Sequence, residues 1–321
     1  MDSINRVVVG VAMPKSRPWD SANLDPASRI AVRQAFHLAG ATGNSLHVMT
    51  VLPEMSDGFF GTEDDAKSQA DADQAEAQQV LDSLLDDYAS LNVAVATQVT
   101  FGRPWLELLT AAGGARETLI CCGTREKNAV SRLLFGSTGL KLLRNAPGPV
   151  WLIKPRIDDD AVMDVLAATD LSEIGVDVIS AGVTLGRALP VKLTVMHVAD
   201  MGFQRQMAHS GASDEQIESY RNEARATAEK LLQEQLTMTD YRTVSNGVQT
   251  QLAEGVADAS LLTAIEELDI DLLIMATSGR GAITGMLFGN TAERILSSLA
   301  CSLMALKPDD FECPIPLAKY V

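Results

Sequence analysis

The chain has 321 residues, which is long for one typical domain and suits two domains of ordinary size. Its 42 Asp and Glu residues outnumber its 26 Lys and Arg residues, and the net charge of −16 argues against nucleic-acid binding because it repels a phosphate backbone. No apolar run approaches the roughly 18 residues of a membrane span, and residues 1–12 lack the pattern of a signal peptide, so we expect a cytoplasmic protein without a membrane segment.

Five apolar segments of the first half are predicted to be strands. They occupy residues 6–12, 45–51, 93–100, 118–122 and 150–154. Between the second and the third strand, apolar side chains recur at the spacing of one helix face. These side chains belong to Leu81, Leu84, Leu85 and Tyr88.

The cysteines and two of the histidines are predicted to be structural. Cys121 and Cys122 are neighbours in an apolar strand, so their side chains point to opposite faces and suit neither a disulfide nor a metal site. We expect buried, reduced thiols, as in the cytosol. His47 and His197 lie within the predicted second strand of each half, where packing in the core is a stronger interpretation than catalysis.

The second half repeats the order of elements of the first. Its predicted strands occupy residues 162–169, 192–198, 244–252, 271–276 and 302–307, and its long helix has apolar residues at Ala224, Ala228, Leu231 and Leu232. Pairs of residues that are 153 positions apart mark the correspondence: Gly102 and Gly255, Gly136 and Gly289, Pro155 and Pro308. Self-similarity at a fixed interval indicates a repeat, and strands that alternate with helices indicate parallel sheets. The sequence therefore predicts an α/β protein of two tandem, doubly wound domains, each with a five-stranded parallel sheet.

The repeat places one domain at residues 1–155, the other at 160–310, and a C-terminal tail at 311–321. The short linker carries Asp158, Asp159 and Asp160. Three adjacent carboxylates could ligate a divalent ion, but a solvated charged linker is the stronger interpretation. We therefore expect no metal site there.

The loop after the fourth strand of the second half is rich in glycine, which lets a backbone approach a ligand closely. The glycines are Gly279, Gly281, Gly285 and Gly289. Asn290 and Thr291 follow and open a predicted helix with an apolar face of Ala292, Ile295, Leu296 and Leu299. Free amides at the start of this helix, with Arg280 nearby in the sequence, favour an anion such as a phosphate group.

The spacing of this loop resembles the ATP-binding motif of the universal stress protein family. In that motif a glycine directly after the fourth strand is followed by two residues, a second glycine, nine residues, and Gly-Ser or Gly-Thr. The second half keeps the spacing with Ala276, Gly279 and Gly289, although Ala276 replaces the first glycine and Asn290 the closing serine. The Gly-Asn-Thr-Ala-Glu form and the later Lys-Pro look like those of a bacterial subtype with two such domains in one chain.

The same family has an Asp-x-Ser pattern after its first strand, which contacts adenosine. Asp170 and Ser172 match it, and Val198 stands where a backbone group of the family meets adenine. The resemblance implies Rossmann-like domains of the HUP superfamily, with ATP and its Mg²⁺, or another anionic small molecule, in the second half. It assigns to the ligand Asp170, Ser172, Val198, Ala276, Gly279, Arg280, Gly281, Gly289, Asn290 and Thr291.

The first half departs from this pattern at two positions. Ala12 stands where the aspartate belongs, and Glu126 replaces the second glycine of the loop. A carboxylate that faces the phosphates would oppose their binding by like charge. No ATP is therefore expected in the first half.

Alternatives remain open for Asp170 and for the function. Aspartate is strongly favoured as a helix N-cap, so Asp170 has this second interpretation. The loop shows no general base and no activated nucleophile, which favours binding without turnover and no catalytic residues. A slow ATPase is one alternative function, and a protein-interaction platform in which both sites are degenerate is the other.

The resemblance also has consequences for assembly. It implies that the last strands of the two halves pair, so that the chain forms an internal pseudo-dimer with Trp151 and Leu303 at the junction. Such pairing would cover apolar strand edges. Whether two chains associate further is left open.

Overall fold

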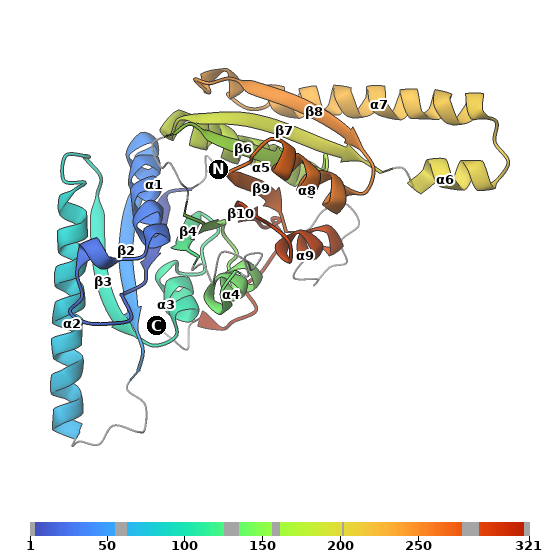
Figure 1. Ribbon diagram of the computed structural model, residues 1–321. Coiled ribbons are helices and arrows are strands. Elements are labelled where there is room, and N and C mark those ends of the chain that lie inside the picture. The colour runs from blue at the N-terminus through green and yellow to red at the C-terminus, as the bar shows by residue number, and fades with distance from the viewer. Residues whose placement is uncertain are drawn as a thin grey trace. The chain divides into compact units, whose positions relative to one another are not determined.

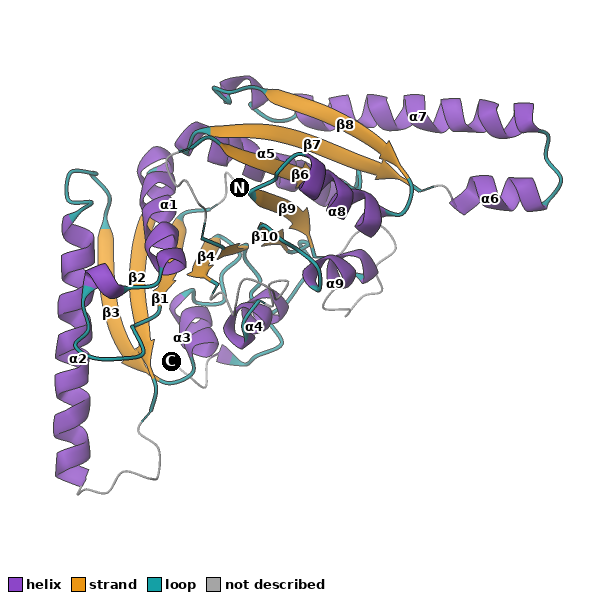
Figure 2. Cartoon of the chain, in the orientation of Figure 1, coloured by secondary structure: helices purple, strands orange, loops and turns teal. Residues whose placement is uncertain are grey.

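The computed structural model describes residues 4–54, 63–124, 135–155, 161–200, 202–277 and 289–317. The chain divides into two compact units (Figures 1 and 2). The first unit holds most of the N-terminal half, to which the C-terminal residues from Glu312 are added, and the second unit holds Asp160–Phe311. Strands and helices alternate along both units.

The first unit has five parallel strands in the order β3-β2-β1-β4-β5. The strands are β1 (Arg6–Val11), β2 (Ser45–Leu52), β3 (Val95–Phe101), β4 (Thr118–Gly123) and β5 (Val150–Ile153). The helices are α1 (Pro26–Thr42), α2 (Glu63–Asp86), α3 (Pro104–Ala111) and α4 (Ser137–Asn145).

The second unit has the corresponding parallel order, β10-β9-β6-β7-β8. Its strands are β6 (Met163–Ala168), β7 (Val191–Ala199), β8 (Val248–Glu254), β9 (Leu272–Ala276) and β10 (Ser302–Leu306). Its helices are α5 (Glu173–Ala188), α6 (Gly202–His209), α7 (Asp214–Thr237), α8 (Ala257–Glu267) and α9 (Asn290–Leu296). The predicted fold class, two tandem α/β domains with parallel sheets, is confirmed.

The central strands are buried because helices flank the sheets. Val7, Val8 and Val9 of β1 are fully buried, and so are the first three residues of β9. Parallel strands that are covered on both faces have such continuous apolar sequences. The edge strands β3 and β8 are partly exposed and carry more polar residues.

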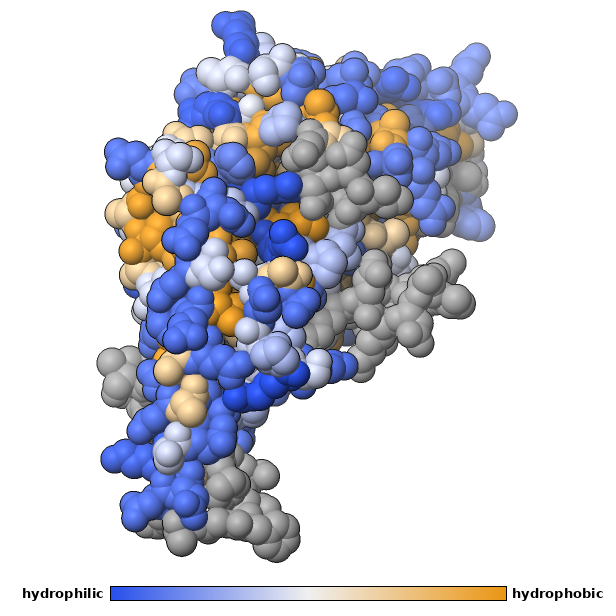
Figure 3. All heavy atoms as spheres, turned by 60° about the vertical axis from the view of Figure 1, so that its left-hand side comes forward, coloured by the Kyte–Doolittle hydropathy of each residue, from blue (hydrophilic) through white to orange (hydrophobic). Residues whose placement is uncertain are grey.

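Two long helices extend beyond the sheets that they cover. In Figure 1, α7 lies along β7 and β8 and continues past the ends of these strands, where α6 lies beside it. Figure 3 shows a mainly hydrophilic surface along the corresponding part of α2. The residues 64–76 of this helix are mostly exposed and include five acidic residues, which keep the extension solvated.

Equivalent turns in the two units support the predicted repeat. Gly102 and Gly255 have φ angles of 138° and 139°, which favour glycine. The Gly102 amide donates to the Leu52 carbonyl at 2.9 Å, and the Gly255 amide donates to the Ala199 carbonyl at 3.0 Å. In each unit, therefore, the glycine after the third strand has the same conformation and the same hydrogen bond to the end of the second strand.

The start of β8 differs most from the sequence prediction. The segment 244–252 was expected to be extended throughout, but β8 begins at Val248. The short 3-10 helix Tyr241–Thr243 and Gly247, with a φ angle of 83°, form a turn before it. The expected start of this strand is wrong because an apolar Val244 packs in the core from the turn.

The four cysteines are free, and Cys121, Cys122 and Cys301 are buried. Burial raises the pKa of Cys122 to about 12, so its reactive thiolate is scarce at neutral pH. We predict that an aromatic disulfide reagent at pH 8 labels one thiol quickly, the half-buried Cys313, and all four after denaturation. Rapid labelling of two or more thiols in the native protein would contradict this burial.

His47 is packed in the first unit, as predicted. The Arg6 guanidinium donates to its Nδ1 at 2.8 Å. Burial, with a smaller contribution from the Arg6 charge, lowers the pKa of His47 despite a hydrogen bond with Gln98. As the pH falls, the imidazole therefore becomes protonated in the unfolded chain at a higher pH than in the folded chain.

The consequence is a loss of stability as the pH falls below about 6.5, the ordinary histidine pKa, because the unfolded state then binds a proton that the native state does not. We predict that His47→Gln makes urea-unfolding free energies less dependent on pH between 7 and 5.5. One proton accounts for at most about 1.4 kcal/mol per pH unit. Equal slopes in the two proteins would refute the role of His47.

Candidate functional site

The carboxyl ends of β6 and β9 flank the point at which the strand order of the second unit reverses. From β6 the chain proceeds to β7 on one side, and after β8 it returns to β9 on the other side. Open parallel sheets bind ligands at such a switch point, outside the carboxyl ends of the strands. Asp170, Val198 and Ala276 all lie at this edge of the sheet.

Asp170 shapes the turn between β6 and α5. Its Oδ1 accepts a hydrogen bond from the Ser172 amide at 3.0 Å and another from the Ser172 hydroxyl. Ser172 is the N-cap of α5, so the alternative that placed Asp170 there is wrong. The carboxylate instead closes an Asx turn two residues earlier, and both side chains are half-buried.

A network of neighbouring polar groups holds the same turn. Leu171 has a φ angle of 62°, and its amide donates to the Thr169 Oγ1 at 3.0 Å. The Thr169 hydroxyl donates to Gln235 Oε1 at 2.8 Å, and Gln235 Nε2 donates to the Ser172 carbonyl at 2.7 Å. The Thr169 carbonyl also accepts from His197 Nδ1 at 2.9 Å. His197 thus makes a structural contact with the backbone beside the expected site.

Sequence reasoning did not identify Thr169 or Gln235. Thr169 directly precedes Asp170, so its position beside a predicted ligand residue was a signal that could have identified it. Gln235 lies 66 residues further along the chain, and no spacing in the sequence connects it with the turn.

The ends of the glycine-rich segment meet at the carboxyl end of β9. The Gly289 amide donates to the Thr277 carbonyl at 2.8 Å, and the Thr277 amide donates to Leu306 at 2.9 Å. Gly289 is the N-cap of α9, and Thr291 is half-buried in its first turn. The helix start expected at Gly289 is present, but the Gly289 amide is already bonded within the chain.

Part of the predicted site lies outside the described residues. This holds for Gly279, Arg280 and Gly281 and for the side chain of Asn290. Glu126 of the first half and the acidic linker 158–160 also lie outside them. These positions remain predictions.

Strand register identifies the equivalent of Asp170 in the first unit. Gly10 of β1 pairs with Cys122, the last residue but one of β4. Ala168 of β6 pairs with Met275, the last residue but one of β9, so Gly10 and Ala168 are equivalent. Ala12 lies two residues after Gly10, and Asp170 lies two residues after Ala168, so Ala12 is the structural equivalent of Asp170. The first unit therefore lacks the carboxylate at this position.

The strand end in the first unit is bonded differently. The Ala12 amide donates to the Ser28 Oγ at 3.3 Å, and the Ser28 hydroxyl donates to Asp25 Oδ2 at 2.6 Å. Asp25 is the N-cap of α1. Gly123 lies so close to α1 that a Cβ on it would be 2.6 Å from the Ala27 carbonyl carbon. The first unit thus uses this region for packing.

The second unit could bind a polar, hydroxylated ligand at this edge. A carboxylate at the end of β6 suits hydrogen bonds from sugar hydroxyls, which it accepts more strongly than a neutral group does. Among the described residues, no group of three His, Cys, Asp or Glu side chains could hold a metal ion. In the same ranges, no helix is long and apolar enough to cross a membrane.

Comparison with known proteins gives the same family for both halves. The model of the universal stress protein family matches residues 22–154 and 162–307. Universal stress protein E of Photorhabdus laumondii is 23% identical over 248 residues, which cover 72% of this chain and 75% of that protein. A universal stress protein of Mycolicibacterium smegmatis is 27% identical over 300 residues, 90% of this chain and 94% of that one.

The fold is also found in solved structures. A crystal structure of a universal stress protein from Pseudomonas aeruginosa superimposes with a TM-score of 0.64 at 21% identity. The match covers 96% of this chain and 95% of that chain. At this identity the likeness concerns the fold alone.

Proposed function

Since the chain belongs to the universal stress protein family, with a family match in each half, we propose that it is a stress-response binding module with a single ligand site, in its second unit. The ligand is ATP, with Mg²⁺, or another anionic small molecule. The first unit contributes structure. The protein binds this ligand in the cytoplasm without turning it over.

The observation that carries the proposal is the difference between the units at equivalent positions. At the end of β6, Asp170 presents a carboxylate at the switch point of the sheet, whereas the end of β1 presents Ala12. A single carboxylate at this edge supports recognition of ribose hydroxyls in one unit only.

The other expected contacts follow from the positions on the same edge. The proposal assigns the Val198 backbone to adenine and the segment from Ala276 to Thr291 to the phosphates. Arg280 would add a positive charge beside them. These assignments agree with the meeting of Thr277 and Gly289, which brings the start and the end of that segment together.

A thermal-shift titration tests the proposal. At about 100 times its dissociation constant, a ligand that binds only the folded chain stabilises it by about 2.7 kcal/mol. ATP should raise the unfolding temperature, and adenosine, which lacks the phosphates, should raise it less. Mass spectrometry of small molecules co-purified with the protein identifies a different anion where one is bound. No shift with ATP and no co-purified ligand would contradict the proposal.

The proposal also includes the domain bounds 1–155 and 160–310 and pairing of the units through their last strands. Within its own unit, β5 is an edge strand, and so is β10. Both are apolar, and apolar edges need to be covered. A specific protease site inserted at 156–160 tests the pairing: the cleaved halves should co-elute in size-exclusion chromatography, and separate elution would contradict it.

A further inference from the structure

A buried polar cluster joins α7 to the turn that carries Asp170. Thr169 is 5% exposed and Gln235 is 8% exposed. Both ends of the Gln235 amide are used, since Oε1 accepts from Thr169 and Nε2 donates to the Ser172 carbonyl. Leaving a buried polar group without its hydrogen bond costs free energy, so this bonded cluster favours one arrangement of α7 against the turn.

Gly175 makes room for this cluster. A Cβ at this position of α5 would lie 2.2 Å from Thr169 Oγ1 and 2.9 Å from Gln235 Oε1. Any other residue would displace one of the two side chains. The helix therefore carries a glycine where the polar pair passes closest to it.

The first unit has an apolar pair at the equivalent positions. The strand register that makes Ala12 the equivalent of Asp170 also makes Val11 the equivalent of Thr169. When the apolar residues near the C-terminal ends of α2 and α7 are aligned, Leu84 is the equivalent of Gln235. Val11 and Leu84 are 4% and 3% exposed. The unit without the carboxylate thus also lacks the polar pair.

We infer that Gln235 is a positioning residue for the ligand turn of the second unit, an inference that rests on the proposed function of that unit. Leu171 holds a left-handed conformation, which a leucine rarely adopts without support. Gln235 Oε1 accepts a hydrogen bond from the Thr169 hydroxyl, which leaves the lone pairs of Thr169 Oγ1 free to accept from the Leu171 amide. Without Gln235 the turn relaxes, and Asp170 leaves the geometry in which it meets a ligand.

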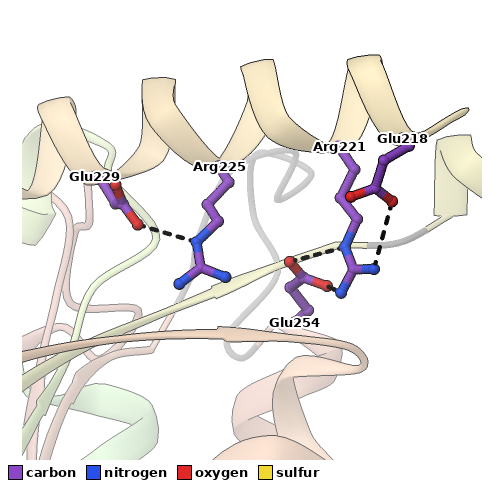
Figure 4. A network of polar contacts seen from close by, with 5 residues as sticks. All are labelled: Glu218, Arg221, Arg225, Glu229 and Glu254. Carbon is purple, nitrogen blue, oxygen red and sulfur yellow. Dashed lines mark hydrogen bonds and ion pairs between the residues drawn. The ribbon is translucent and has the colours of Figure 1, made fainter. Parts of the chain in front are cut away.

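A second contact of α7 supplies a matched control. Arg221 forms two hydrogen bonds with Glu254 at the end of β8, of 3.2 and 2.6 Å, as Figure 4 shows. Its guanidinium is also 3.9 Å from Glu218, and Arg225 pairs with Glu229 at 3.0 Å. The Arg221–Glu254 pair links α7 to the edge strand β8, the other two pairs lie within α7, and none of the three involves the ligand turn.

The test replaces the polar pair by its apolar counterpart in the first unit, in the double variant Thr169→Val, Gln235→Leu. Replacing both partners leaves neither the Thr169 hydroxyl nor the Gln235 amide unpaired in the core, so the apo protein should keep its fold. The Leu171 amide loses its acceptor on Thr169, and the resulting loosening of the turn is the effect under test. The dissociation constant for ATP, measured by calorimetry, should rise at least tenfold. The control variant Arg221→Ala should bind ATP as the wild type does.

Hydrogen exchange of the apo protein gives a readout that needs no ligand. The amides of Leu171 and Ser172 should exchange at least tenfold faster in the double variant, while amides of β9 keep their rates. The single variant Gln235→Leu should show the same pattern and serves if the double variant does not fold. An unchanged dissociation constant or unchanged exchange in these amides would overturn the inference. A wild type that binds no ATP would instead contradict the proposed function, and the exchange rates would still decide whether Gln235 positions the turn.

Discussion

Replacing Asp170 by alanine is expected to weaken ATP binding about 10- to 150-fold, the range that corresponds to losing a hydrogen bond with a charged group, roughly 1.5 to 3 kcal/mol. The carboxylate is half-buried at the switch point, and Ser172 orients it through two hydrogen bonds. No equivalent carboxylate is present at Ala12 to compensate. Isothermal calorimetry with purified wild-type and variant chains measures the change.

Two further variants separate binding from folding. Asp164→Ala removes an aspartate from the opposite, amino end of the same strand, where it pairs with Lys192 at 3.3 Å, and should leave the affinity unchanged. Asp170→Asn keeps an acceptor for the Ser172 amide, so it tests the charge with the turn retained. Equal ATP affinities of the wild type and Asp170→Ala would exclude Asp170 as a ligand contact.

The second large effect is expected in the first unit, where Gly123→Ala should lower the free energy of unfolding by about 2 to 3 kcal/mol. The added Cβ would lie 2.6 Å from the Ala27 carbonyl carbon and 2.7 Å from the Ser28 nitrogen. Both are backbone atoms, so the clash cannot be relieved by a side-chain rotation. Urea unfolding followed by circular dichroism measures the loss.

A matched substitution in the same unit has the opposite expected sign. A Cβ on Gly40, within α1, would be 3.4 Å from the Val93 side chain, an ordinary contact. Gly40→Ala should therefore stabilise the protein by about 0.5 to 1 kcal/mol, because alanine is the better helix former. Similar stabilities of Gly123→Ala and Gly40→Ala would show that α1 does not pack on the end of β4 as closely as described.

The repeat, the order of strands and helices along the chain and the parallel sheets could be predicted because they depend on local signals. Buried parallel strands such as β1 and β9 are continuous apolar runs, and Gly102 and Gly255 mark the same turn in each half. The resemblance to a known motif placed Asp170 after the first strand of its unit. The structure puts this residue at the switch point, as a doubly wound sheet requires.

Other features depend on contacts that the sequence does not show. Gln235 reads as one polar position of a long helix, and only the packing of α7 brings it to Thr169. Ser172, and not Asp170, is the N-cap of α5, because the Asp170 carboxylate closes a turn before the helix begins. The Gly289 amide looked free in the sequence, but the carbonyl that it meets belongs to Thr277, on the other side of the glycine-rich segment.

The central claim is that one of the two units binds the ligand. Native mass spectrometry of the full chain, with Mg·ATP near the wild-type dissociation constant and then in large excess, counts the bound nucleotides directly. The account predicts that the wild type never exceeds one ATP per chain and that Asp170→Ala has a much smaller bound fraction at the lower concentration. Two ATP per chain in excess ATP, or equal bound fractions in the two proteins at the lower concentration, would contradict it.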